Sequence, residues 1–187
     1  YEGSDAKQSA ILQADVIADA LEKDRSKIDR NGDSVIQFAM LEGESGHQDT
    51  LIRSEWVLKE LENKKIPTQQ IAGSTGNWEK NQANVIVRQW MKEYPNQIEV
   101  IISNNDDMAL GVYDYYKQHN LKLPLILGIN NSPEMNQKIQ AGEIYGTVDN
   151  GTNDQISYIC KLLNDILNKD TAKYHKIWYS KPFAIEK

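Results

Sequence analysis

The stretch that decides the fold is Ile98-Glu99-Val100-Ile101-Ile102-Ser103-Asn104-Asn105-Asp106. Its apolar half is typical of a short buried strand, and the apolar residues over 106–118 recur at helical spacing. A strand, a polar turn and a helix in this order form one unit of a parallel α/β sheet. Ligands bind such sheets beyond the carboxyl ends of the strands, so the turn is a candidate site. The adjacent acids Asp106-Asp107 are expected to cap the helix.

The same alternation of strand and helix extends outward over nearly the whole chain. Helices are predicted over 5–23, 49–64, 78–94, 106–118 and 154–167, and a further helix starts at 132–134. Strands are predicted over 35–41, 68–73, 98–102, 124–129, 143–148 and 177–185. Pro182 places the last strand at an edge or in a crossing segment, because proline donates no ladder hydrogen bond. The sequence therefore predicts an α/β fold with a doubly wound, parallel, Rossmann-like sheet.

The composition narrows the classes of function. The 187 residues carry a net charge of −6, so no excess of lysine and arginine exists for nonspecific binding of nucleic acid. No apolar run approaches the roughly 20 residues that cross a bilayer, and no membrane insertion by this chain is expected. The single cysteine, Cys160, excludes an internal disulfide and a cysteine zinc cluster. No phosphate loop, dinucleotide fingerprint or nucleophile elbow appears, so we do not expect an enzyme.

Polar residues follow the predicted strands and suggest a sugar site. Asp49 and Arg53 lie one helical turn apart, either as a surface ion pair or as an acceptor and a donor for a polyol. Trp78 is either a core residue or an exposed stacking platform. The asparagines at 104–105 and 130–131 either cap helices or bind a ligand. A pyranose needs planar polar partners for its hydroxyls and an aromatic ring for its C–H face.

A loop before the first central strand has the spacing of a calcium site. The run Asp29-Arg30-Asn31-Gly32-Asp33-Ser34-Val35-Ile36-Gln37 places oxygen ligands at alternate positions, as an EF-hand loop does. Met40 stands where an EF-hand has its bidentate glutamate, and Ser34 stands where it has glycine. The spacing alone therefore also fits a polar turn between a helix and a strand. Glu99 begins a strand expected to pair with 35–41, so it could supply the missing carboxylate.

Seven motifs together point to one family. They are Tyr1-x-Gly3-x-Asp5, the loop 29–37 followed by Phe38, Gly43-Glu44-x-Gly46-His47-x-Asp49, Ile98-Glu99-Val100, Ser103-Asn104-Asn105-Asp106-x-Met108-Ala109, Gly128-Ile129-Asn130-x-x-Pro133-Glu134 and Gly146-Thr147-Val148-x-Asn150. Over nearly its whole length the chain resembles the galactose/glucose-binding proteins of bacterial ABC sugar uptake, in the type I periplasmic-binding-protein class. The resemblance implies a Rossmann-like lobe of a two-lobed fold.

The resemblance also implies a role for each candidate residue. The sugar would be bound by His47, Asp49, Arg53, Trp78, Asn105, Asn130 and Asn150, with the ring of Trp78 stacked on one sugar face. Calcium would be bound by Asp29, Asn31, Asp33, the Val35 carbonyl, Gln37 and Glu99. The family has an aspartate where this chain has Asn130, so the choice among sugars stays open. An amide adds donors and loses a charge relative to a carboxylate.

By the same resemblance the chain holds one lobe and part of another. Residues 1–150 would form the C-terminal sugar-binding lobe with the calcium loop. Residues 151–180 would belong to an N-terminal lobe that is mostly missing from the sequence, and 181–187 would return to the first lobe. Because the chain begins with Tyr1, we expect it to be processed or cut from a longer protein.

The expected function is capture of a hexose, galactose or glucose, between two lobes for an ABC permease. A chemoreceptor or a sensor kinase would be a further partner. The expected location is periplasmic or extracellular, with a lipid anchor through a preceding segment as one option. The alternative is the sugar-sensing core of a transcriptional regulator. The calcium loop argues against that alternative, because cytosolic calcium is too low for a modest site.

Overall fold

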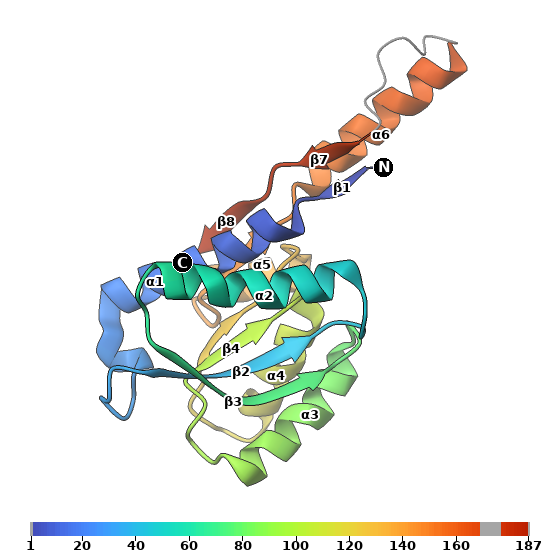
Figure 1. Ribbon diagram of the computed structural model, residues 1–187. Coiled ribbons are helices and arrows are strands. Elements are labelled where there is room, and N and C mark those ends of the chain that lie inside the picture. The colour runs from blue at the N-terminus through green and yellow to red at the C-terminus, as the bar shows by residue number, and fades with distance from the viewer. Residues whose placement is uncertain (1, 169–176, 187) are drawn as a thin grey trace.

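The computed structural model describes residues 2–168 and 177–186, and its helices and strands alternate along the chain (Figure 1). The strands are β1 (Glu2–Ser4), β2 (Ile36–Glu42), β3 (Thr68–Thr75), β4 (Val100–Ser103), β5 (Leu125–Leu127), β6 (Gly146–Asp149), β7 (Trp178–Ser180) and β8 (Phe183–Glu186). The helices are α1 (Ala6–Ile28), α2 (Gln48–Asn63), α3 (Lys80–Glu93), α4 (Asp106–Gln118), α5 (Pro133–Gln140) and α6 (Thr152–Leu167).

A six-stranded sheet with the order β3-β2-β4-β5-β6-β8 forms the centre of the main body. Neighbouring strands from β3 to β6 pair in parallel, and β8 pairs antiparallel with β6 at one edge. In the centre, Met40 of β2 lies beside Ile102 of β4. The predicted pairing of the strand after the loop 29–37 with the strand after Glu99 is therefore confirmed, and so is the doubly wound sheet.

Alternate residues of β2 face two different helix layers. Phe38 and Met40 belong to the core beneath α1 and α2, whereas Ala39 and Leu41 belong to the core shared with α3 and α4. Successive side chains of a strand point to opposite faces, so a strand buried on both sides is apolar throughout. Figure 1 shows α1 and α2 on one side of the sheet and α3 and α4 on the other.

Two expectations about element boundaries need correction. The first helix extends to Ile28, but its backbone breaks at Asp24 (φ −161°, ψ 78°), directly after its predicted end at residue 23. The predicted strand 177–185 is two strands. β7 pairs with β1 in a separate two-stranded sheet, and β8 joins the main sheet after Lys181 and Pro182. A crossing segment at Pro182 is therefore confirmed.

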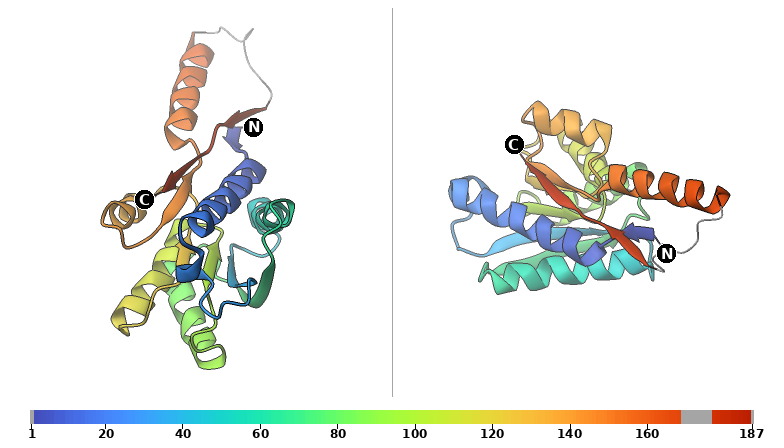
Figure 2. Two further views of the ribbon diagram at one scale, coloured as in Figure 1. Left: turned by 90° about the vertical axis from the view of Figure 1, so that its left-hand side faces the viewer. Right: turned by 90° about the horizontal axis from the view of Figure 1, so that it is seen from above.

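Helix α6 projects away from the main body, together with β1 and β7 (Figures 1 and 2). None of its residues is buried. Its apolar side is exposed, with Leu163 55% and Leu167 81% accessible. Tyr158 stacks on Trp178 of β7, with ring centroids 4.4 Å apart. Within the described residues no helix is both long and apolar enough to cross a membrane.

The apolar side of α6 predicts self-association of the isolated chain, because exposed patches of this kind promote contact between copies. Replacing Leu163 by Gln should weaken that association on the order of tenfold, since apolar area at the contact is lost. Sedimentation velocity over a concentration series measures it. Lys161→Gln is the matched control, because Lys161 lies on the other side of the helix. A monomer at all concentrations, or equal effects of both variants, would contradict the prediction.

Candidate functional site

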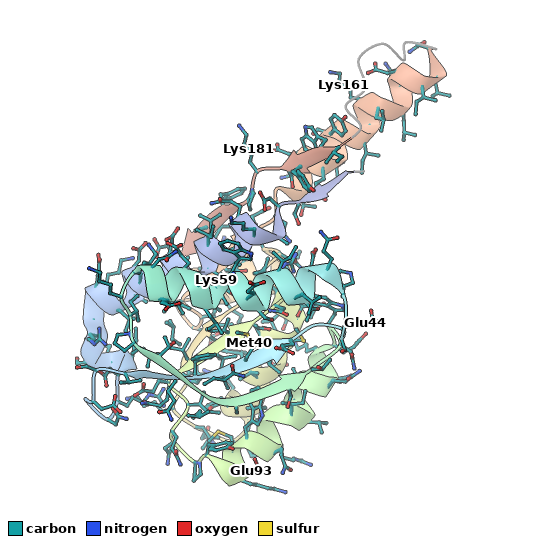
Figure 3. All side chains as sticks on the ribbon, in the orientation of Figure 1. Met40, Glu44, Lys59, Glu93, Lys161 and Lys181 are labelled. Carbon is teal, nitrogen blue, oxygen red and sulfur yellow. The ribbon has the colours of Figure 1, made fainter. Side chains whose placement is uncertain are left out.

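Most of the predicted sugar ligands lie just beyond the carboxyl ends of the parallel strands. Figure 3 labels Glu44, in the turn after β2, at the edge of the sheet toward which these strands run. His47, Asp49 and Arg53 follow β2, Trp78 follows β3, and Asn105, Asn130 and Asn150 follow β4, β5 and β6. The strand order places these turns side by side, because β3, β2, β4, β5 and β6 are successive neighbours.

The start of α2 holds a buried arginine in a fixed position. Arg53 is 4% exposed, and its Nη2 donates to Asp49 Oδ2 at 2.8 Å. Its Nη1 donates to the Asn104 carbonyl at 2.8 Å. Burial lowers the pKa of the Arg53 guanidinium, while the nearby carboxylates of Asp49 and Asp106 oppose that shift. Nε of Arg53 is buried without a hydrogen-bond partner among the described residues. The pair of Asp49 and Arg53 is therefore partly buried and held in place, and is not the solvent-exposed surface ion pair that the sequence also allowed.

His47 caps α2 and is fixed in one tautomer. Its Nδ1 accepts a hydrogen bond from the Asp49 N–H at 3.1 Å. A neutral imidazole that accepts at Nδ1 carries its proton on Nε2. The exposed His47 ring therefore offers a donor at the ligand edge.

Trp78 lies against the turn after β2 rather than deep in the core. Its ring is edge-on to His47, with centroids 5.3 Å apart, and the Arg53 guanidinium carbon lies 5.9 Å from the ring centroid. A Cβ at Gly43 would collide with the Trp78 ring at 2.2 Å, so glycine is required there. The backbone of Trp78 has a φ of +68°. The indole is partly buried against the core, which is compatible with one face being left for a ligand.

Asn105 caps a helix and still has one amide N–H that makes no hydrogen bond among the described residues. Its Oδ1 caps α4 by accepting from the Met108 N–H at 3.0 Å, and its Nδ2 donates to the Trp78 carbonyl at 3.0 Å. The capping interpretation of this asparagine is thus confirmed. Its amide has one further N–H, so ligand binding requires no loss of the cap.

Asn130 and Asn150 form a second group at the same edge. Asn150 Nδ2 donates to Asn130 Oδ1 at 2.8 Å. The two groups are connected through the neighbouring turns, because the Asp106 N–H donates to the Ile129 carbonyl at 2.9 Å.

Asp106 does not cap α4, contrary to the sequence-based expectation. Its carboxylate accepts from the Ser132 N–H at 2.6 Å and from the Thr147 hydroxyl at 2.5 Å, and so joins α4 to the turn before α5 and to β6. The side chain is 1% exposed. Burial raises the pKa of Asp106 to about 6, although both hydrogen bonds work against that shift.

Two residues of α1 support this edge and were missed from the sequence. Gln13 Nε2 donates to the carbonyls of Ser103 and Gly128, at 2.9 and 3.2 Å, at the ends of β4 and β5. Ser9 contacts Asn150, with Oγ 2.8 Å from Oδ1. The sequence does contain a sign of this role. A glutamine and a serine lie on the apolar side of a helix, where buried polar groups need a hydrogen-bond partner.

The proposed calcium ligands gather at the opposite end of β2. Glu99 accepts from the Arg30 and Gln37 N–H groups, at 2.5 and 3.0 Å, so it binds both ends of the loop. Asp29 accepts from the N–H groups of Gly32 and Ser34. A hollow of about 350 Å³ is lined by Arg30, Asn31, Asp33, Gln37, Gln69, Ile71, Asn96, Gln97 and Glu99.

The carboxylate and amide oxygens of this loop are the kind of donors that hard cations prefer, but their present arrangement does not form a coordination shell. In residues 2–168 and 177–186, no three His, Cys, Asp or Glu side chains gather closely enough to hold a metal. Asn31 Nδ2 and Gln37 Nε2 both point at Asp33 Oδ2, at 2.9 and 3.0 Å. Both amides must turn over for their oxygens to face a shared cation.

The buried carboxylate of Asp106 predicts a pH dependence of stability. Its folded-state pKa is raised from 3.8 to about 6, so the folded protein binds this proton more tightly than the unfolded chain. The stability from this group is fully present well below pH 3.8 and is lost as pH rises through 6. The stability of the wild type relative to Asp106→Asn should fall by about 2.5 kcal/mol between pH 4 and 7.5. Urea unfolding measures this difference, and Asp107→Asn is the control at the exposed neighbouring position. A constant or rising difference would contradict the assignment.

Comparison with known proteins identifies the family. The model of a periplasmic binding protein domain matches residues 1–171. The D-galactose/methyl-galactoside binding periplasmic protein of Haemophilus influenzae is 40% identical over 179 residues, which are 95% of this chain and 54% of that protein. A xylitol-binding protein of Mycolicibacterium smegmatis is 26% identical over 75% of this chain and 40% of its own length. This chain thus spans about half the length of these curated relatives.

Solved structures share the fold. A periplasmic solute-binding protein of an ABC transporter from Actinobacillus succinogenes, with bound D-allose, superimposes with a TM-score of 0.82 at 22% identity. The match covers 98% of this chain and 60% of that one. A solute-binding protein from Bacillus halodurans with bound myo-inositol has the same TM-score at 19% identity and covers 99% of this chain and 59% of that one. These relatives bind solutes and are not enzymes. The chain belongs to the periplasmic binding protein family and has its type I fold.

Proposed function

We propose that the carboxyl edge of the sheet binds a neutral hexose of the galactose and glucose class. The single observation that carries this proposal is the group formed by Asp49, buried Arg53, His47 and Trp78. A charged acceptor, fixed donors and an aromatic ring meet at the N-terminal end of α2, with the ring supplied by the turn after β3. Planar polar groups beside an aromatic face match the alternating hydroxyl and C–H surfaces of a pyranose.

The choice of galactose rests on the Haemophilus relative, whose name states galactose binding, and glucose rests on the sequence resemblance alone. More distant structures carry allose or myo-inositol, so the fold by itself selects no sugar. In the whole protein, the bound sugar would be delivered to an ABC permease, and the site of action would be the periplasm or the cell exterior. A chemoreceptor or sensor kinase would be an additional partner.

We further propose that the described part of 151–180, residues 151–168 and 177–180, packs on a second lobe supplied outside this sequence; residues 169–176 of that range lie outside the described residues. Support comes from the exposed apolar side of α6, with Ile156 and Leu163 each 55% accessible, and from the greater length of the relatives. A sugar bound between two lobes would contact both and so favour the closed arrangement. One lobe supplies one wall of the site.

Sugar binding is tested on the 187-residue chain. Because one wall is present, galactose should bind with a Kd in the millimolar range, and the full-length Haemophilus relative, assayed in parallel, should bind far more tightly. Asp49→Asn should weaken binding on the order of tenfold, because it removes a charged hydrogen-bond acceptor. NMR titration with galactose and glucose measures both, and Asp107→Asn is the matched control. Micromolar binding by a monomer would show a site complete within one lobe, and equal effects of both variants would contradict the placement of the site.

We also propose that the loop 29–37 and Glu99 bind one calcium ion. Asp29, Asn31, Asp33, the Val35 carbonyl, Gln37 and Glu99 would supply oxygen ligands, and calcium would act by holding the loop to the starts of β2 and β4. The support is the loop's oxygen-rich composition and the two N–H groups, from either end of the loop, that Glu99 already binds. Hard oxygen donors are the ligands that calcium prefers.

Calcium should raise the melting temperature of the chain, because a ligand of the native state stabilises it by mass action. The gain is about 4 kcal/mol at a thousandfold excess over Kd. Asp33→Asn should remove at least half of that gain. Its control is Asp24→Asn, which removes an exposed carboxylate that pairs with Lys27 outside the loop. Calorimetric unfolding with calcium and with a chelator measures the gain. No calcium effect, or equal losses in both variants, would refute the site.

A further inference from the structure

A chain of three side chains runs from the interior of α1 to the ligand edge. It begins at Ser9, which is 0% exposed, and passes through Asn150, which is 8% exposed. Ser9 Oγ lies 2.8 Å from Asn150 Oδ1, and Asn150 Nδ2 lies 2.8 Å from Asn130 Oδ1. Asn130 is exposed at the end of the chain of contacts.

The direction of these hydrogen bonds depends on where the Ser9 hydroxyl directs its hydrogen. Its hydroxyl has one hydrogen and two acceptors in reach, Asn150 Oδ1 at 2.8 Å and the Asp5 carbonyl at 3.0 Å. A hydrogen directed at Asn150 fixes the Asn150 oxygen toward Ser9 and its NH₂ toward Asn130. A hydrogen directed at Asp5 would require Asn150 to donate to Ser9, and every amide in the chain of contacts would then be reversed.

The outward group of Asn130 follows from this direction. When the Ser9 hydrogen is directed at Asn150, the Asn130 oxygen accepts from Asn150 Nδ2, and the NH₂ of Asn130 is the group left for a ligand. The backbone of Asn130 is fixed too, because its N–H donates to the Val148 carbonyl at 2.7 Å. The carbonyl of Asn150 accepts from Ser180 Oγ at 2.5 Å and from Gln155 Nε2 at 3.0 Å. Neither asparagine needs a ligand to hold its position.

We propose that Ser9 is a positioning residue which, through Asn150, makes Asn130 present a hydrogen-bond donor to the sugar. This inference rests on the proposed sugar site and adds a selectivity to it. The NH₂ of Asn130 can therefore bind a sugar atom that accepts a hydrogen bond but cannot donate one, such as a ring oxygen, an ether oxygen or the fluorine of a C–F group. A carboxylate at the same place would require a hydroxyl that donates.

The direction of the hydrogen bonds along Ser9, Asn150 and Asn130, called the relay below, is measured without any sugar. In the ¹³C,¹⁵N-labelled 187-residue chain, scalar coupling across the hydrogen bond should connect Asn150 Nδ2 with Asn130 Cγ. The coupling of Gln13 Nε2 to the Ser103 carbonyl serves as the internal standard, because that bond is 2.9 Å long and buried. In Ser9→Ala the coupling should weaken, because Asn150 loses the partner that orients it. A coupling from Asn130 Nδ2 to Asn150 Cγ, no coupling where the standard is visible, or no change in Ser9→Ala would overturn the proposal.

The selectivity is measured by ¹⁹F NMR titration with the monofluoro-deoxy galactoses, compared with galactose. For the analogue with fluorine at the ring position that faces Asn130, the wild type should keep an affinity close to that for galactose. Asn130→Asp, which keeps an oxygen for Asn150 but directs the other outward, should lose on the order of tenfold in affinity for that analogue. Ser9→Ala should also lower the affinity for that fluorinated analogue relative to galactose, and so behave like Asn130→Asp. Ser157→Ala is the control, because the Ser157 hydroxyl makes the same bond to the carbonyl four residues back, at 2.8 Å, on α6.

The results separate the two proposals. If the couplings show the expected direction and no galactose binds, the sugar site fails and the relay stands. If galactose binds and Asn130→Asp leaves every fluorine preference unchanged, Asn130 does not select the ligand, and the proposed role of Ser9 is refuted. If Ser157→Ala changes the relative affinity for the fluorinated analogue as much as Ser9→Ala does, the effect is not specific to Ser9. The proposed role of Ser9 is refuted in that case too.

Discussion

Buried polar contacts of Gln13 and Asp106 hold the carboxyl ends of β4, β5 and β6 together, and the ligand edge depends on them. Gln13 donates to the carbonyls of Ser103 and Gly128, where two neighbouring strands end. Asp106 then accepts from the turn after β5 and from Thr147 of β6. Buried backbone groups without partners are costly, so strand ends that lie under a helix need such side chains. The same contacts fix the spacing of the turns that carry Asn105, Asn130 and Asn150.

A site arranged in this way is preorganised, whereas the segment beyond it is not. Arg53, His47 and Asn105 each keep a hydrogen bond to their own scaffold, so little side-chain freedom remains to be lost when a ligand binds. Helix α6 differs, because its apolar side contacts solvent over most of its length. The main body therefore has a closed core of its own, whereas β1 and β7 contact one side of α6 and leave the apolar side with Leu163 exposed.

The sequence predicted the order of elements well, because both helix layers impose strong patterns. In the run 98–118, a strand that is apolar except for Glu99 is followed by a helix of period 3.6, and the structure buries the strand and one side of the helix. The carboxyl-edge rule also placed the turns that hold His47, Trp78 and Asn130. Ser9, Gln13 and Asp106 were missed or misassigned because their partners lie far along the chain. Gln13 and Ser103, for example, are separated by 90 positions. The break at Asp24 and the division of the last strand depend on what each segment packs against.

The two proposed sites lie at opposite ends of the same strands, which limits how they can influence each other. The loop 29–37 enters β2 at Ile36, and the turn to His47 leaves it at Glu42. Seven residues of strand span roughly 20 Å at about 3.3 Å per residue. Glu99 precedes β4 and Asn104 follows it in the same way. Substitutions separated by more than about 10 Å without shared partners usually have additive effects. We therefore expect the two sites to act independently, so that a cation at the loop would act on the stability of the sheet rather than on contacts with the sugar.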